Sequence, residues 1–261
     1  MIVDTHVHVW PDKIARAALA RPQEDLQRQG DGTERGAIAA MASAGIDRCV
    51  CLGVAPDPKR VEAANRYAGS LDPAHFVGFG SIHARLSPEQ NVESLRRNGL
   101  KGAKVHPLFQ GYALDDPGLW ATLDAMQGEF AIIAHVGEGD SGESNTRCTP
   151  AMLKALVQRF PRLDVVACHF GGYRLLDEVE RTIVGLPVYV DTSWPPGLWS
   201  LDRARVRAIV ERHGPERVLF GSDWPMADPA RCVAAIEALG LSDDDTAAVL
   251  GGNAARLLRL E

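Results

Sequence analysis

Two histidines near the start of the chain, His6 and His8, have the residue type and the spacing of metal ligands. They lie in the largely apolar run of residues 2–9, which predicts a buried strand. Side chains on a strand alternate between its two faces, so residues two apart point the same way. Imidazole is a common ligand of zinc and related ions. A His-x-His pair is also compatible with two polar residues at a strand end, so the other polar residues of the chain must decide between this interpretation and a metal site.

Further polar residues lie at the ends of other apolar runs, and Asp223 follows one of them. A carboxylate buried there needs a cation or several hydrogen-bond donors. Taken singly, His135 and His169 would be explained as core histidines, but together with the His6/His8 pair and Asp223 they favour a metal site. Five of the eight histidines fall at predicted strand ends (His6, His8, His106, His135, His169), in contrast to His75, His83 and His213. Lys104, Asp191, Ser193 and Ser222 also lie at strand ends.

Eight apolar runs alternate with amphipathic segments. Strands are predicted at residues 2–8, 48–54, 76–82, 102–106, 131–136, 164–169, 188–192 and 217–223. Helical patterns occur between them, for example at residues 61–70, 88–98, 119–127, 151–160, 175–183 and 203–213. This alternation indicates a parallel sheet covered by helices, and eight strands predict a (β/α)8 TIM barrel, an α/β fold, in one domain over residues 1–261. The alternative, a doubly wound open sheet, usually has fewer strands and a glycine-rich phosphate loop that this sequence lacks.

Two segments interrupt the alternation. Residues 11–32 are polar and irregular, and we expect an extra loop or a short helix over the barrel mouth. Residues 137–149 are rich in Gly, Ser and Asn, a composition typical of an active-site loop. Functional residues of such barrels lie at the carboxyl ends of the strands, so both segments would border the site.

The composition of the chain excludes several classes of protein. Apolar residues make up 46% and charged residues 24%, as in ordinary globular proteins, and the net charge of −6 provides no basic surface for nucleic acid. No apolar stretch is long enough for a membrane span, and no signal peptide is recognisable. The five cysteines form no Cys-x-x-Cys pair. We therefore expect a cytoplasmic protein without disulfides that binds a small molecule; a homo-oligomer is compatible with the sequence.

Several segments resemble the amidohydrolase superfamily, in particular its amidohydrolase-related branch, which also contains enzymes like aminocarboxymuconate-semialdehyde decarboxylase. They span the whole chain in the expected order. The closing residues 252–258 are similar to the start of the C-terminal helix of that branch. The other segments are Asp4-Thr5-His6-Val7-His8, Lys101-Gly102-Ala103-Lys104-Val105-His106-Pro107, His169-Phe170-Gly171-Gly172 and Phe220-Gly221-Ser222-Asp223-Trp224-Pro225.

The resemblance implies that His6, His8, His135 and Asp223 bind a divalent metal, with Asp223 as ligand or water-orienting carboxylate. His169 would lie near the bound water as general base or electrophile. Such a ligand set leaves one position for water, whose pKa the metal lowers to about 7. Asp223 can hold the proton of that water, and His169 can polarise the substrate or move the proton. The nitrogen and oxygen ligands suit zinc, while manganese and iron are compatible.

The number of metals depends on the end of the fourth predicted strand, where Lys104 and His106 share a face. In binuclear members of the superfamily a carboxylated lysine bridges two metals, and Lys104 with His135 and His169 would hold the second one. The Lys-x-His-Pro pattern is more similar to the mononuclear branch, in which this lysine is unmodified. We therefore expect one metal, although an ion-pair or core role for Lys104 stays open.

Aromatic and basic residues near the strand ends are candidates for contact with a substrate. Tryptophans offer flat apolar walls with one N–H donor, but core or lid packing explains each of them equally well. The positive charges of Lys104, Arg147 and Arg174 in an acidic protein predict a substrate that carries a carboxylate. The candidates are Trp10, Lys104, His106, Phe109, Arg147, Tyr173, Arg174, Trp194 and Trp224.

Three functions are compatible with these residues. The first is metal-dependent hydrolysis of a small ester, lactone or amide by an activated water. The second is non-oxidative decarboxylation of a small unsaturated or aromatic acid, in which the site donates a proton to carbon. The third, a non-catalytic barrel, predicts that a ligand is missing, and none is. The sequence thus predicts an enzyme. The resemblance supports both activities and no residue separates them, so we take the hydrolase as the main prediction and the decarboxylase as the alternative.

Overall fold

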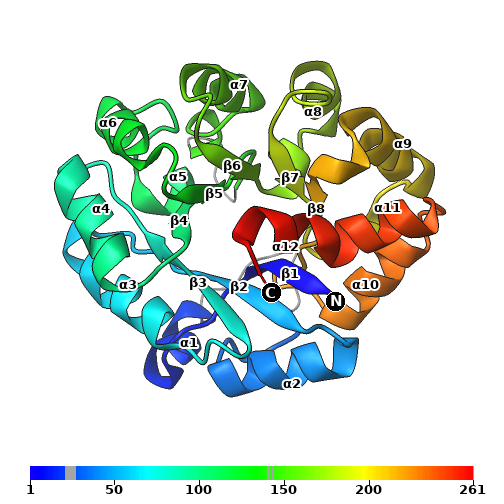
Figure 1. Cartoon of the computed structure of the whole chain (residues 1–261), viewed down its shortest axis with the longest axis horizontal. Coiled ribbons are helices and arrows are strands. Elements are labelled where there is room, and N and C mark those ends of the chain that lie inside the picture. Colours follow the sequence, from blue (N-terminus) through cyan, green and yellow to red (C-terminus); the bar gives the residue numbers. More distant parts are fainter. Residues whose placement is uncertain (21–27, 140–141, 143, 261) are drawn as a thin grey trace. The chain divides into compact units, whose positions relative to one another are not determined.

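The computed structural model describes residues 1–20, 28–139, 142 and 144–260. Eight strands form one sheet in which each strand is hydrogen-bonded to the next one in the chain (Figure 1). The strands are β1 (Val3–Val7), β2 (Arg48–Leu52), β3 (Phe76–Ser81), β4 (Gly102–Val105), β5 (Ala131–Ala134), β6 (Asp164–Ala167), β7 (Tyr189–Asp191) and β8 (Val218–Leu219). The pairs β1–β2, β3–β4, β4–β5, β5–β6 and β6–β7 are parallel.

The first strand also pairs with the segment of the last one. The Thr5 amide donates to the Phe220 carbonyl (2.8 Å), and Val7 forms a parallel bridge with Trp224. Eight strands in sequence order whose first and last members are neighbours have the topology of a (β/α)8 barrel. The predicted fold class is therefore confirmed.

Helices follow the strands as the sequence predicts. The α-helices are α1 (Asp12–Ala18), α2 (Glu34–Ala44), α3 (Val61–Ser70), α4 (Pro88–Arg97), α5 (Pro107–Gln110), α6 (Pro117–Met126), α7 (Pro150–Arg159), α8 (Leu176–Thr182), α9 (Arg203–His213), α10 (Pro229–Glu237), α11 (Asp243–Ala247) and α12 (Asn253–Leu258). Short 3-10 turns are η1 (Pro58–Arg60), η2 (Ser144–Thr146), η3 (His169–Gly171), η4 (Leu198–Ser200) and η5 (Pro215–Arg217), and a π-helical turn, η6 (Ala248–Gly252), joins α11 to α12.

The helix starts follow from local chemistry. At α4 the Ser87 hydroxyl accepts from the Gln90 amide, while the Gln90 side chain accepts from the Ser87 amide, and Pro88 occupies the first turn. This capping box satisfies two otherwise unpaired groups, and proline lacks the amide that would stay unpaired there. Thr149 caps α7 in a similar way by accepting from the Met152 amide.

The chain divides into two compact units. The first comprises Met1–Cys51, Leu71–Val77 and Asp191–Glu261, and the second comprises Leu52–Ser70 and Gly78–Val190. Within the first unit, α2 packs against α10; within the second, α4 packs against α6 (Figure 1). That residues 1–261 behave as one domain stays a prediction.

All eight strands end one to four residues before the end of the range that the apolar pattern predicts. β6 ends at Ala167 rather than at His169, and β8 ends at Leu219 rather than at Asp223. Within the two predicted ranges the backbone leaves the extended region at the last residue: φ is 59° at His169 and 66° at Asp223. A positive φ is incompatible with an extended strand, so the chain turns at the two residues for which a catalytic role is predicted.

The two irregular segments are partly described. Residues 11–32 contain the short helix α1, and the Trp10 amide donates to the Gly32 carbonyl (2.9 Å), which holds the ends of the segment together. The predictions for residues 21–27, 140–141 and 143 lie outside the described residues. The place of residues 11–32 over the barrel mouth stays a prediction.

Candidate active site

His6, His8 and Asp223 bring three potential ligand atoms together in the first unit. Nε2 of His6 and Nε2 of His8 each lie 3.7 Å from Oδ1 of Asp223. One ligand atom from each residue lies within 4.8 Å of the others. Metal–ligand bonds of about 2.1 Å at tetrahedral angles separate ligand atoms by about 3.4 Å. The nitrogen and oxygen atoms of these three residues therefore fit around one zinc-sized ion.

Backbone contacts hold the segments of this group in register. The Asp223 amide donates to the His6 carbonyl (2.9 Å), and the His8 amide donates to the Trp224 carbonyl (2.8 Å). The left-handed backbone of Asp223 costs about 1–3 kcal/mol for a residue other than glycine. Such conformations concentrate at functional sites, where surrounding contacts compensate for them.

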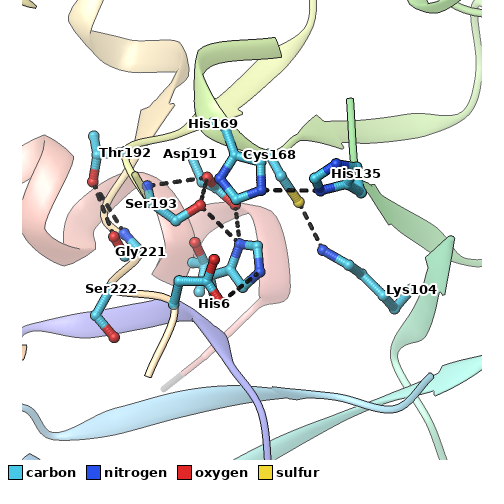
Figure 2. A network of polar contacts seen from close by, with 12 residues as sticks. His6, Lys104, His135, Cys168, His169, Asp191, Thr192, Ser193, Gly221 and Ser222 are labelled. Atoms are coloured by element: carbon cyan, nitrogen blue, oxygen red, sulfur yellow. Dashed lines mark hydrogen bonds and ion pairs between the residues drawn. The ribbon is translucent and has the colours of Figure 1, made fainter. Parts of the chain in front are cut away.

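The second ring nitrogen of His6 is engaged by two further residues of the same unit. Its Nδ1 lies 2.8 Å from Oδ2 of Asp191 and 2.9 Å from Oγ of Ser193 (Figure 2). All three residues are buried. Asp191 and Ser193 were recognised in the sequence as strand-end residues without a role, because their contact with His6 spans more than 180 residues of chain.

Asp4 holds the chain segments that carry His6 and Asp223. Its Oδ1 accepts from the amides of His6 (3.0 Å) and Ser222 (2.9 Å), and its Oδ2 accepts from the Ser222 hydroxyl (2.5 Å). Burial raises the pKa of Asp4 to about 7, although the hydrogen bonds from Ser222 and His6 act in the opposite direction. Asp4 therefore braces the backbone on both sides of the predicted ligands, a role that the sequence did not reveal.

His135 and His169 meet in the second unit. Nδ1 of His135 lies 3.1 Å from Nε2 of His169 (Figure 2), and both side chains are buried. The contact uses Nδ1 of His135, so the other ring nitrogen, Nε2, is not the atom that faces His169. The structure thus brings together two of the histidines that the sequence singled out. That His135 completes the ligand set of His6, His8 and Asp223 stays a prediction.

Two more candidate residues stack on His135. The ring of His106 lies 4.3 Å from that of His135 at an interplanar angle of 7°. On the other side, Phe109 stacks on His106 at 4.0 Å and is 56% exposed. This aromatic stack restricts rotation of the His135 ring and leaves the large apolar side chain of Phe109 accessible.

Lys104 is completely buried, and its Nζ lies 2.8 Å from Sγ of Cys168 (Figure 2). Cys168 precedes His169 directly. A protonated lysine is a suitable donor for this sulfur. The number of metals and a substrate role for Lys104 both stay predictions.

The two candidate arginines lie on segments beside the exit of β5. The Gly137 amide donates to the carbonyl of Cys148 (2.7 Å), the residue after Arg147, and Gly137 also forms a bridge with Tyr173. Arg174 is exposed, has a φ of 63°, and its guanidinium lies 5.2 Å from the centroid of the Tyr173 ring. Both segments therefore lie next to the residues that follow His135.

The three candidate tryptophans differ in environment. Trp10 is half-buried and stacks on His8 with a centroid distance of 5.8 Å. Trp194 and Trp224 are buried, and Trp224 lines a small pocket with Met41. Packing against the core, which the sequence left open, accounts for the burial of Trp224. Contact of any of the three with a substrate stays a prediction.

His83 was set apart from the strand ends in the sequence, but it follows β3 by two residues and is buried. Its Nδ1 accepts from the Arg85 amide (3.2 Å), and the Asn91 side chain pairs with its backbone. Burial lowers the pKa of His83. It is a sixth histidine at a strand exit, and its hydrogen bonds hold the turn before α4.

The sequence model of the amidohydrolase family matches residues 3–260. The chain belongs to the amidohydrolase family. It is therefore an enzyme of the class that the sequence predicted, and hydrolases and decarboxylases both occur among the proteins it resembles. No helix in the described part of the chain is long and apolar enough to cross a membrane.

One relative and two solved structures illustrate this relationship. The L-fucono-1,5-lactonase of Burkholderia ambifaria is 26% identical to this chain, over 99% of this chain and 96% of the lactonase. A TIM-barrel protein of Bordetella bronchiseptica is 19% identical, with a TM-score of 0.76 and coverage of 99% and 98%. The 5-carboxyvanillate decarboxylase of Sphingomonas paucimobilis is 21% identical, with a TM-score of 0.71 and coverage of 100% and 99%. At these identities the two structures support the fold alone.

Proposed function

We propose that this amidohydrolase is a metal-dependent hydrolase that opens a small lactone with water. The observation that carries the proposal is the convergence of His6, His8 and Asp223 on a volume that fits one metal ion. The choice of a lactone over an ester or amide is supported by the relative that is named as a lactonase.

His6, His8 and Asp223 would hold the ion, with His135 as the fourth protein ligand. Zinc is the proposed ion, because two or three imidazoles and one carboxylate form a ligand set typical of zinc enzymes. When bound, such an ion would lower the pKa of a water and polarise the lactone carbonyl. The stack of His106 and Phe109 would keep the ring of His135 in place for this role.

Asp223 and His169 would move the protons. Asp223 would accept a proton from the attacking water, because its Oδ1 is next to the proposed metal ligands. His169 would polarise the carbonyl or carry a proton to the ring oxygen as the carbon–oxygen bond breaks. The sum of the steps is one lactone and one water giving a hydroxy acid, which loses one proton at neutral pH.

Arg147 and Arg174 would bind a carboxylate. Both lie on segments next to the residues after His135, and guanidinium groups match carboxylates in shape and charge. The carboxylate would belong to the substrate, or it would be the group that forms when the ring opens. The five cysteines are buried and none forms a disulfide, which is consistent with a reducing compartment, and we propose that the enzyme acts in the cytoplasm.

The test combines metal analysis with two assays on protein purified without chelator. We expect about one zinc per chain, proton release from a panel of small lactones, loss of that activity on chelation and its return with Zn²⁺. His8→Ala should lose both metal and activity, whereas His75→Ala, which changes a half-buried histidine outside the site, should keep both. Hydrolysis by metal-free protein would refute the proposal. Carbon dioxide release from unsaturated or aromatic acids, without lactone opening, would favour the decarboxylase instead.

A further inference from the structure

We propose that Asp191, together with Ser193, is a positioning residue that keeps the proton of His6 on Nδ1 and thereby sets the metal affinity of the site. The inference rests on the proposed function, because His6 acts there as a metal ligand. It assigns a task to a buried carboxylate that does not belong to the proposed ligands.

Asp191 lies at the end of β7 and is inaccessible to solvent. Its two oxygens have separate partners (Figure 2). Oδ2 lies 2.8 Å from Nδ1 of His6, while Oδ1 accepts from the Ser193 amide (3.1 Å) and from the Ser193 hydroxyl (2.5 Å). Both contacts with Ser193 require Asp191 to accept, and a carboxylate has acceptor atoms alone.

Counting hydrogens assigns the tautomer of His6. The Ser193 hydroxyl has one hydrogen, and it points to Asp191. Toward Nδ1 of His6, at 2.9 Å, the Ser193 oxygen can therefore only accept. Nδ1 thus faces two acceptors and must carry the proton itself. In the neutral imidazole this leaves the lone pair on Nε2, the nitrogen 3.7 Å from Oδ1 of Asp223.

This arrangement is the one that metal sites use to orient a histidine ligand. A carboxylate that accepts from the second ring nitrogen fixes the tautomer and the ring plane and makes the ligating nitrogen more basic. Loss of such a partner typically weakens metal binding by about 10–100-fold. Asp4, another buried carboxylate near His6, contacts backbone amides and Ser222 rather than the imidazole, so it cannot replace Asp191.

The first measurement uses metal-free wild-type protein labelled with ¹⁵N-histidine. Two-bond ¹H–¹⁵N correlations distinguish a protonated ring nitrogen from an unprotonated one, and His6→Gln identifies the signals. We expect His6 to carry its proton on Nδ1 in the wild type and to populate both tautomers in Asp191→Ala. A wild-type His6 with its proton on Nε2 would overturn the inference, whether or not the protein binds metal.

The second measurement is the Kd for Zn²⁺, determined by competition with a chromophoric chelator. We expect Asp191→Ala to raise Kd about 10–100-fold and Ser193→Ala to raise it less. Asp191→Asn, which keeps the shape but removes the charge, should lie between them. The matched control is Thr192→Val, because Thr192 is equally buried on the same strand exit but pairs with Gly221 (Figure 2). The Kd of Thr192→Val should stay within about twofold of the wild type, because substitutions that do not touch the residues of a site usually have little effect on it.

The outcomes separate this inference from the proposed function. If the wild type binds Zn²⁺ and the Asp191 variants bind it equally well, Asp191 has no positioning role and the proposed function stands. If the wild type binds no Zn²⁺, the proposed function fails, and the tautomer of His6 still decides the inference. The melting temperature of each metal-free variant shows whether it is folded; if Asp191→Ala does not fold, Asp191→Asn and Ser193→Ala provide the comparison.

Discussion

Ser222 offers a sharp test of how the site is held together. Its hydroxyl donates to Oδ2 of Asp4 (2.5 Å) and accepts from the Trp224 amide (3.0 Å), and it is inaccessible to solvent. Ser222→Ala removes this hydroxyl without adding atoms. The side chain of Asp223, the proposed ligand that follows, is unchanged. The variant therefore tests the brace between Asp4 and the β8 segment.

The expected loss of stability follows from the two lost contacts. A hydrogen bond to a charged group, which Asp4 is above about pH 7, contributes about 1.5–3 kcal/mol, and a buried amide left without a partner costs about 1–3 kcal/mol at any pH. Because a small shift of the chain can recover part of this, we expect the free energy of unfolding to fall by about 3 kcal/mol. Ser43→Ala, at an exposed serine of α2, is the control and should change it by less than about 0.5 kcal/mol.

The loss should also depend on pH. Burial raises the pKa of Asp4 to about 7, above the 3.8 of an unfolded aspartate, so this group lowers the stability as pH rises from about 4 to about 7. The hydrogen bond from the Ser222 hydroxyl lowers the pKa of Asp4 and so opposes the effect of burial. Without it the folded-state pKa is higher, and the loss continues above pH 7. Each further pH unit adds about 1.4 kcal/mol to the destabilisation.

Urea unfolding of metal-free wild type and Ser222→Ala at pH 5 and pH 8 measures both effects. We expect destabilisation at both values and a larger one at pH 8. A loss below about 1 kcal/mol, less than one buried hydrogen bond, would refute the brace. An equal loss at both pH values would show that Asp4 does not titrate under the control of Ser222.

Three further predictions concern the chemistry and the pH range of the enzyme. At saturating Zn²⁺, Asp223→Asn should lower kcat for lactone opening about 10²–10⁴-fold, and a kcat within fivefold of wild type would exclude Asp223 as the proton acceptor. Burial lowers the pKa of His83, so the folded state resists its protonation and the free energy of unfolding should fall as pH drops below about 6.5. Urea unfolding at pH 5 and pH 7 should show a weaker pH dependence in His83→Gln than in the wild type. An equal pH dependence in both proteins would contradict this role of His83. Arg174→Ala should lower kcat/KM about 10–100-fold for carboxylate-bearing substrates and leave neutral ones unaffected; no effect on any substrate found would rule out the carboxylate role.

The secondary structure was largely predictable because it depends on local periodicity. The helices expected at residues 61–70 and 203–213 have the same bounds in the structure, as α3 and α9. All eight strands occur where apolar runs predict them. The strand ends were less predictable: all eight predicted ranges are one to four residues too long, and those of β6 and β8 run into the left-handed backbone of His169 and Asp223. Such a conformation follows from contacts around these residues, such as the bond from the Asp223 amide to the His6 carbonyl, and not from the local apolar pattern.

The sequence by itself determined the fold class, the family and the face that His6 and His8 share, since all of these follow from short patterns and strand alternation. Only the tertiary structure decided that Asp223 meets both histidines and that Asp191 holds the second nitrogen of His6. His6 and Asp191 are 185 residues apart in the chain, and a buried aspartate looks the same in a sequence whether it braces a ligand or a turn. Contacts at this separation depend on how the strands pair across the sheet, and a local pattern carries no information about that.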